Sequence, residues 1–140
     1  MEKKYFTPKE VNKRLPLIKQ ILSDILAKGA ELKQISIAAG SSQEQAAYEK
    51  AMAKVNVLVD ELENLGCFYK DWSFEKGLVD FPAVINGQEV MLCWQGNEPD
   101  VRWYHAVDGG YQGRCLIPEE LLDVSNNPQQ KAPEILEETH

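Results

Sequence analysis

The segment Asp80–Trp94, with the sequence DFPAVINGQEVMLCW, determines the fold of the C-terminal half. Asn86-Gly87 lies at its centre, and this dipeptide between two apolar runs is the strongest short signal for a β-hairpin with a two-residue turn. A two-residue turn fixes the pairing of the strands, which places Asp80 opposite Cys93. The sequence therefore predicts an antiparallel strand pair in which these two side chains are cross-strand neighbours.

Side chains alternate between the two faces of this predicted hairpin. The apolar face is the predicted core face, and it carries Phe81, Ala83, Ile85, Val90, Leu92 and Trp94. The other face carries Asp80, Pro82, Val84, Glu89, Met91 and Cys93. Pro82 has no backbone N–H to donate, so we expect its strand at an edge or a bulge of the sheet.

Shorter elements flank the hairpin on both sides. The predicted elements are strands over 67–72, 101–107 and 114–117 and a closing helical turn over 118–122. Residues 125–140 are rich in Asn, Gln, Pro and Glu, a composition typical of disorder. The C-terminal half is thus predicted to be a small antiparallel sheet with a short closing helix over 67–122, followed by a disordered tail.

The N-terminal half, residues 5–66, has the apolar periodicity of two helices. Each begins with a capping box, formed by Thr7 with Glu10 and by Ser41 with Glu44. Pro16 lies too deep for a straight helix, so we expect the first helix to kink or break there and to continue to about Ala39. Gly66 has the position of the glycine that ends a helix, which gives the second helix a length of about 24 residues.

Together these elements predict an α+β fold in which a long N-terminal antiparallel helical hairpin precedes a small antiparallel sheet, as a single domain over residues 1–124. The apolar stripes of the two helices are long for a chain of 140 residues. Either the C-terminal half covers them, or a second copy of the chain does so in a four-helix interface. We expect a homodimer through the hairpin, because a small sheet does not cover the full length of both helices.

Composition limits the classes of function. The chain has 15 Lys and Arg against 22 Asp and Glu, a formal net charge of −7, which argues against binding of nucleic acid. No apolar run is long enough to span a membrane, and no signal peptide is recognised. The three cysteines are Cys67, Cys93 and Cys115, too few and too scattered for a disulfide framework. We therefore expect a cytoplasmic protein.

His105, Cys93 and Asp80 are the candidate metal ligands, because together they offer the nitrogen, sulfur and oxygen atoms that suit zinc. The alternative for His105 is a half-buried structural histidine, since no familiar zinc motif spaces these residues. Two registers of the following strand stay open. One pairs Arg102 with Cys93 and puts His105 on the core face, and the other places His105 beside Met91.

Asp80 and Arg114 are also candidate catalytic residues together with His105. The alternative for Asp80 is pairing with Arg102 or Arg114, or with loop amides. The alternative for Arg114, which follows a glycine-rich loop, is an ion pair that fastens this loop to a carboxylate.

Aromatic residues are concentrated in the C-terminal half, mostly as core. Some of them are candidates for the wall of a small-molecule pocket that also includes Asp80, His105 and Arg114. The candidate ligand-binding residues are Trp94, Arg102, Tyr104 and Tyr111.

Several blocks of the chain occur in a characteristic order. These are Gly77-Leu78-Val79-Asp80-Phe81-Pro82-Ala83, Leu92-Cys93-Trp94, Tyr104-His105 and Gly110-Tyr111-Gln112-Gly113-Arg114, preceded by Phe6-Thr7 and Leu15-Pro16-Leu17. They resemble an uncharacterised prokaryotic family catalogued as domain of unknown function number 2203. The resemblance covers roughly residues 5–118 and implies a helical hairpin followed by a small sheet, without an activity.

Two positions depart from the pattern of that family. Gln95 stands where an Arg is typical, and Ala106 stands where a carboxylate usually follows the His. The second departure argues against a mechanism that needs a His–carboxylate pair at 105 and 106.

From these observations we expect a cytoplasmic, non-enzymatic interaction or small-ligand-binding module without a cofactor, which self-associates through its hairpin. The alternative is a metal-assisted or acid/base enzyme of hydrolase type. It would use Asp80, His105 and Arg114, with zinc as the metal and Cys93 as a further ligand.

Overall fold

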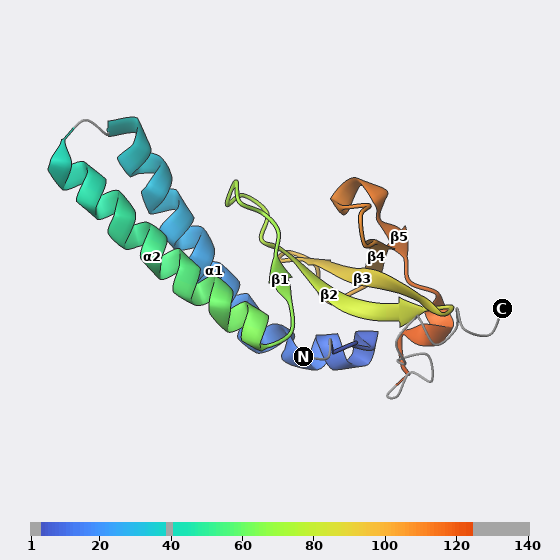
Figure 1. Ribbon diagram of the computed structural model, residues 1–140. Helices are drawn as coiled ribbons and strands as arrows, with labels where there is room; N and C mark the ends of the chain where they lie inside the picture. Colours follow the sequence, from blue (N-terminus) through green and yellow to red (C-terminus); the bar gives the residue numbers. More distant parts are fainter. Residues whose placement is uncertain (1–3, 39–40, 125–140) are drawn as a thin grey trace.

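The computed structural model describes residues 4–38 and 41–124 and shows an α+β fold (Figure 1). Helices α1 (Pro8–Ala38) and α2 (Ser42–Asn64) precede strands β1 (Phe68–Tyr69), β2 (Leu78–Ile85), β3 (Gln88–Gln95), β4 (Trp103–Ala106) and β5 (Cys115–Leu116). Short 3-10 turns, η1 (Tyr111–Gly113) and η2 (Glu119–Leu121), flank β5. The predicted fold class is confirmed. The predicted disordered tail, 125–140, lies outside the described residues.

Helix α1 starts as the sequence predicts. The Thr7 hydroxyl accepts a hydrogen bond from the N–H of Glu10 at 3.1 Å, and the Glu10 carboxylate accepts one from the N–H of Thr7 at 2.9 Å. The helix continues through Pro16 without a break, and Figure 1 shows its first turns running at an angle to the remainder. Pro16 is exposed, and a bend in the helix relieves the clash of its ring with the preceding turn.

Helix α2 runs alongside α1 in the opposite direction (Figure 1). Its capping box at Ser41 and Glu44 is formed, and Gly66 follows its end with a φ of +100°. The side chains of α2 that are buried are Ala51, Val55, Val59 and Leu62. They pack in one core with Ile18, Leu22, Ile25 and Leu32 of α1. No helix within the described residues is long and apolar enough to cross a membrane.

The five strands form one antiparallel sheet in the order β1-β2-β3-β4-β5. The pairing of β2 with β3 has the predicted register, with Asp80 opposite Cys93. Asn86 and Gly87 both have positive φ, as the tight turn requires. The predicted core face joins the helical core through Phe81, Leu92 and Trp94. Beyond the end of β1, Pro82 is free of a neighbouring strand on that side, and its carbonyl accepts from the N–H of Phe6 at 2.8 Å.

Strand β1 is shorter than the predicted strand over 67–72, because Asp71 redirects the chain. The buried Asp71 carboxylate accepts hydrogen bonds from the hydroxyl and N–H of Ser73 and from the N–H groups of Glu75, Lys76 and Gly77. Backbone groups committed to this carboxylate are not available to a strand ladder. Asp71 therefore converts the end of the predicted strand into a loop.

The same loop brings Phe74 against α1. A Cβ atom at Gly29 would lie 2.3 Å from the Phe74 ring, so only glycine leaves room for this contact. Phe74 also stacks on Tyr69, with ring centroids 6.2 Å apart. Gly29, which interrupts the apolar pattern of α1, thus makes room for Phe74 of the loop to pack against the helix.

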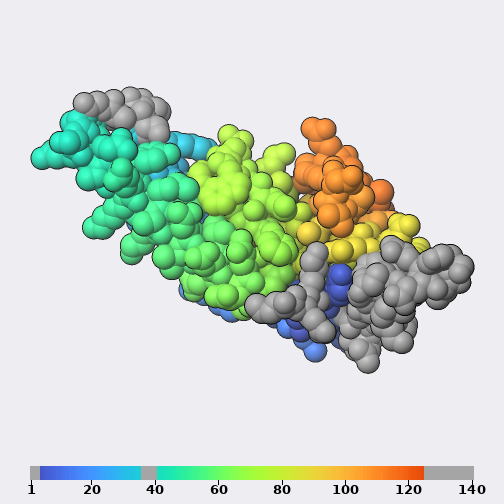
Figure 2. Space-filling view, in the orientation of Figure 1, coloured from blue at the N-terminus to red at the C-terminus, as the bar shows by residue number. Residues whose placement is uncertain are grey.

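The far ends of α1 and α2 project beyond the sheet (Figure 1), and in the space-filling view they form an arm at one side of the molecule (Figure 2). Nearer the sheet, the helices pack against its core face. Val101, just before β4, donates its N–H to the side-chain oxygen of Asn12 in α1 at 2.8 Å. This arrangement leaves the other face of the sheet, with Asp80 and Cys93, directed away from the helical core.

Candidate functional site

Three strands bring Asp80, Cys93 and His105 to one face of the sheet. Asp80 on β2 pairs with Cys93 on β3, and His105 on β4 pairs with Met91. Met91 and Cys93 lie two residues apart and so share a face. Of the two registers that the sequence left open, the structure has the one that places His105 beside Met91.

The ligand atoms of these three side chains all lie within 4.8 Å of one another. Nε2 of His105 is 3.1 Å from Oδ2 of Asp80. Exposure is 3% for Asp80, 1% for Cys93 and 3% for His105, so the cluster is buried. We call these three residues the Asp–Cys–His cluster.

The second ring nitrogen of His105 has its own partner. Nδ1 lies 2.7 Å from the carbonyl oxygen of Ala106, and a carbonyl can only accept a hydrogen bond. Nδ1 is therefore the protonated nitrogen, and Nε2 faces Asp80. A backbone carbonyl on one nitrogen is the usual way in which a metal-binding histidine is oriented, with the other nitrogen directed at the metal.

Without a metal, the Cys93 thiol holds its proton firmly. The pKa of this thiol is raised to about 12, mainly by burial and next by the neighbouring Asp80 charge, while Arg114 acts in the opposite direction. A divalent cation would reverse this preference, because metal binding displaces the thiol proton. A thiolate, a carboxylate and a neutral imidazole then balance two positive charges, which leaves a neutral centre in a buried environment.

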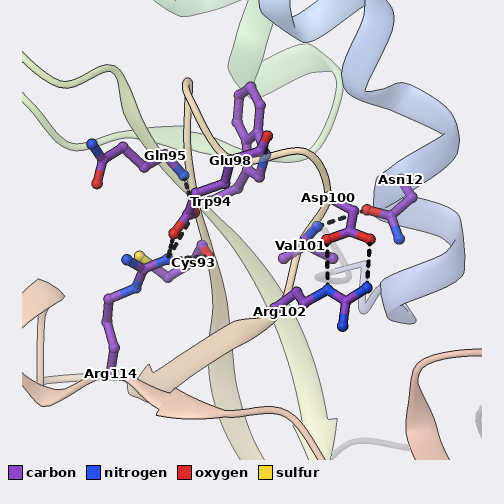
Figure 3. Close-up of polar contacts among 9 residues, drawn as sticks. All are labelled: Asn12, Cys93, Trp94, Gln95, Glu98, Asp100, Val101, Arg102 and Arg114. Atoms are coloured by element: carbon purple, nitrogen blue, oxygen red, sulfur yellow. Dashed lines mark hydrogen bonds and ion pairs between the residues drawn. The ribbon is translucent and has the colours of Figure 1, made fainter. Parts of the chain in front are cut away.

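Asp80 pairs with His105 and not with an arginine, which corrects the sequence-based alternative. Arg102 binds Asp100 instead, at 2.8 Å and 3.1 Å, on an exposed part of the surface (Figure 3). His105 on β4, with β3 between it and Asp80, therefore takes the place that we expected Arg102 or Arg114 to occupy. The register of β4 decides this, and the sequence alone left it open.

Arg114 lies beside the Asp–Cys–His cluster without joining it. Its Nη2 donates to both carboxylate oxygens of Glu98 at 2.8 Å and to the carbonyl of Cys93 at 3.3 Å (Figure 3). The guanidinium also lies 4.9 Å from the Trp103 ring centroid and 4.8 Å from that of Tyr111. The ion pair that fastens the glycine-rich loop to a carboxylate is thus confirmed.

Glu98 is the residue of this region that the sequence analysis did not single out. Its carboxylate also accepts from the N–H of Gln95 at 2.8 Å, and its backbone carbonyl accepts from the Trp94 indole at 3.1 Å. It therefore shapes the turn after β3 as well as holding Arg114. A lone carboxylate in a polar turn gave no signal of this role.

The four candidate ligand-binding residues do not surround the Asp–Cys–His cluster. Trp94 is fully buried in the core on the opposite face, and Tyr104, which pairs with Leu92, packs against the same core. Arg102 is exposed, and the Tyr111 hydroxyl donates to the Gln95 side chain at 3.0 Å. The structure therefore separates Trp94 and Tyr104 from the cluster with which the sequence grouped them.

Comparison with known proteins identifies one family. The model of a family described as "Uncharacterized conserved protein (DUF2203)" matches residues 4–117. Neither the curated proteins nor the solved structures gave a match.

Proposed function

We propose that this chain, which belongs to the DUF2203 family of uncharacterized conserved proteins, is a non-enzymatic module whose sheet holds a zinc-type divalent ion between Asp80, Cys93 and His105. One observation carries the proposal. Three different metal-ligating side chains, from three strands, place their ligand atoms within 4.8 Å of one another in a buried cluster. Ligands about 2.0 to 2.3 Å from a tetrahedral zinc are themselves about 3.3 to 3.6 Å apart, so small side-chain rotations suffice.

The chemistry of the donors favours zinc over magnesium or calcium. Those two ions take oxygen ligands, whereas a thiol and an imidazole suit zinc and its neighbours among the transition metals. Three protein ligands leave one tetrahedral position for water. Such a three-ligand set is the coordination of catalytic zinc, but the burial of all three side chains closes the open position to a substrate and so favours an ion that stabilises the fold.

The enzymatic alternative has less support from the same residues. It requires Arg114 to meet a substrate, but the carboxylate of Glu98 already binds this guanidinium. It also requires access to Asp80 and His105, whose side chains are 5% and 3% exposed. A substrate would have to displace the ion pair and open the sheet.

The proposed compartment is the cytoplasm, and nucleic acid is not a proposed partner. The free thiols of Cys67, Cys93 and Cys115 fit a reducing environment, and a net charge of −7 opposes attraction to phosphate backbones. Self-association is a further part of the proposal. Trp72, 48% exposed, lies beside a largely apolar groove of about 600 Å³ that includes Leu32 and Met52 of the two helices.

Elemental analysis of the protein purified from zinc-containing medium tests the metal proposal. We expect stoichiometric zinc in the wild type and in Cys115→Ser, whose thiol is exposed and is not part of the cluster. Cys93→Ser and His105→Ala should lose it while circular dichroism shows retained helix. Saturating zinc at 100 times its Kd should stabilise the wild type by about 2.7 kcal/mol and leave these two variants unchanged. A wild type that neither retains nor takes up zinc after refolding would refute the proposal.

A further inference from the structure

The segment between β4 and β5 lies on the same side of the sheet as the Asp–Cys–His cluster. We call this segment, residues 107–114, the strap. It contains η1, and Figure 1 shows this turn, in orange, on the side of the sheet away from the helices. The helices pack on the opposite, core face, so they do not cover the cluster. The strap is in a position to do so.

The pairing of the strands shows how close the strap comes to Cys93. Trp103 pairs with Cys93, and Gln95 lies two residues after Cys93, so these three side chains share one face. The Tyr111 hydroxyl of the strap donates to Oε1 of Gln95 at 3.0 Å. The Arg114 guanidinium lies 4.9 Å from the centroid of the Trp103 ring. The strap therefore rests on both neighbours of Cys93 on that face.

Arg114 also approaches Cys93 directly. Its Nη2 donates to the Cys93 carbonyl at 3.3 Å, and Figure 3 shows the Cys93 sulfur on the side of the guanidinium. The Arg114 side chain is only 10% exposed, and its buried Nε has no hydrogen-bond partner among the described residues. A buried N–H without a partner costs free energy, which an open strap would recover by exposing this group to water.

Few contacts attach the strap to the sheet. Residues 107–113 are all exposed. Where its backbone N–H groups donate within turns, they do so to carbonyls three residues earlier in the chain, which stabilises the turns and does not attach the strap to the sheet. Its attachment consists of the side-chain contacts of Arg114 and Tyr111, whose ring centroid also lies 4.6 Å from the Lys76 ammonium. Segments with so few buried contacts open at a lower free energy than the core.

Glycines on both sides of Tyr111 allow the strap to turn. Gly110 has a φ of +70°, a conformation that favours glycine. A Cβ atom at Gly110 or at Gly113 would meet no atom within 4 Å, so the backbone has free space around it. A few such positions suffice as a hinge.

We propose that the strap is a lid that controls access to the Asp–Cys–His cluster. It opens at Gly110 when Tyr111 leaves Gln95 and Arg114 leaves Glu98, and it then exposes Cys93 without unfolding the helical core. The passage of a metal ion through this opening rests on the proposed metal centre, whereas the opening itself does not.

Alkylation of the metal-free full chain by N-ethylmaleimide, followed by mass spectrometry of its peptides, tests the opening. Cys67 is the internal reference, because it is buried in the core that the helices share with the sheet and becomes accessible only when that core unfolds. Tyr111→Ala removes contacts of the strap without a change of charge. We expect it to raise the alkylation rate of Cys93 about tenfold or more and to leave that of Cys67 within about threefold.

Gln112→Ala, at an exposed position of the same strap, is the matched control and should change neither rate. Glu98→Gln should act like Tyr111→Ala, because it weakens the bond to Arg114 and keeps an acceptor for the N–H of Gln95. A Cys93 rate that stays the same in Tyr111→Ala, or that rises only together with the Cys67 rate, would overturn the proposal.

Release of zinc to a chelator distinguishes the lid from the metal centre. Zinc-loaded Tyr111→Ala should hold the same stoichiometry as the wild type and release it about tenfold faster. Equal release rates from the two proteins would overturn the lid. A wild type that binds no zinc, but whose Cys93 alkylation still depends on Tyr111, would refute the metal centre and support the lid.

Discussion

The three thiols of the chain differ in their surroundings. Cys67 and Cys93 are buried, and Cys115 is exposed. Burial raises the pKa of both buried thiols to about 12, and thiol reactivity depends on the thiolate. In metal-free native protein at pH 8, we therefore expect one thiol to react rapidly with Ellman's reagent and two to react only on unfolding. Cys115→Ser should abolish the rapid phase, and rapid labelling of Cys93 in the native state would contradict the burial of the cluster.

Asp71 gives a prediction about pH. Burial alone would raise the pKa of this carboxyl, but hydrogen bonds from Ser73 and from backbone N–H groups lower it to about 2, against 3.8 for the free side chain. A lowered folded-state pKa contributes stability that is present above pH 4 and is lost as pH falls towards 2. This contribution is about 2 kcal/mol.

Asp71→Asn should therefore lower the free energy of unfolding by about 2 kcal/mol at pH 7 and flatten its dependence on pH between 4 and 2. Urea unfolding across this range measures both effects. Asp108→Asn, at an exposed position, serves as the control and should change neither. An unchanged pH profile in Asp71→Asn would show that this carboxylate does not hold the loop.

The sequence predicted the positions of some residues of the site but not of others. The Asn86-Gly87 turn determines that Asp80 and Cys93 are neighbours, since a two-residue turn allows one register. His105 could not be placed, because a change of one residue in the loop before β4 moves it to the other face. Asp71 binds backbone N–H groups of its own loop, and Glu98 binds both the N–H of Gln95 and the distant Arg114; no local side-chain pattern predicts such contacts.

At the scale of elements, the end of α2 depends on Gly66. Its φ is +100°, and a Cβ atom there would lie 2.4 Å from Cζ of Phe6. Gly66→Ala should therefore destabilise the protein by about 2 to 4 kcal/mol, since it combines backbone strain with a clash. Chemical denaturation measures the loss.

Gly113→Ala is the matched control, because no atom lies within 4 Å of the added Cβ. It should change the free energy of unfolding by less than about 0.5 kcal/mol. Similar effects of the two substitutions would mean that the contact between Phe6 and the end of α2 does not stabilise the native state.

Helix and strand boundaries followed the sequence wherever a local signal existed. The capping boxes at Thr7 and Ser41 fixed the helix starts, and the turn at Asn86 fixed β2 and β3. The predicted length of β1 was too great, because the aromatic residues after Cys67 have strand propensity. In the structure, the Asp71 carboxylate binds backbone N–H groups and ends the strand. Strand propensity depends only on the residues within the segment, and it does not show that the Asp71 carboxylate would bind the backbone of the following loop.

At the scale of the whole molecule, self-association remains a prediction. The helical arm projects beyond the sheet, and exposed Trp72 lies beside its apolar groove. Sedimentation equilibrium at micromolar concentration should give about twice the chain mass of 15.8 kDa. Trp72→Ser, which removes apolar surface at the groove, should shift the equilibrium towards monomer, whereas Val107→Ser, on the C-terminal half, should not. A wild type that sediments as monomer would exclude the dimer.

The sheet brings together three candidate ligands, Asp80, Cys93 and His105, from three strands, although they are far apart in the sequence. Titration with Co²⁺ tests this convergence most directly, because a cobalt–thiolate bond gives a charge-transfer band in the near-ultraviolet. We predict a band that saturates at a single equivalent of Co²⁺, is absent from Cys93→Ser and persists in Cys115→Ser. Absence of the band in the wild type, or its persistence in Cys93→Ser, would contradict a metal centre at Asp80, Cys93 and His105.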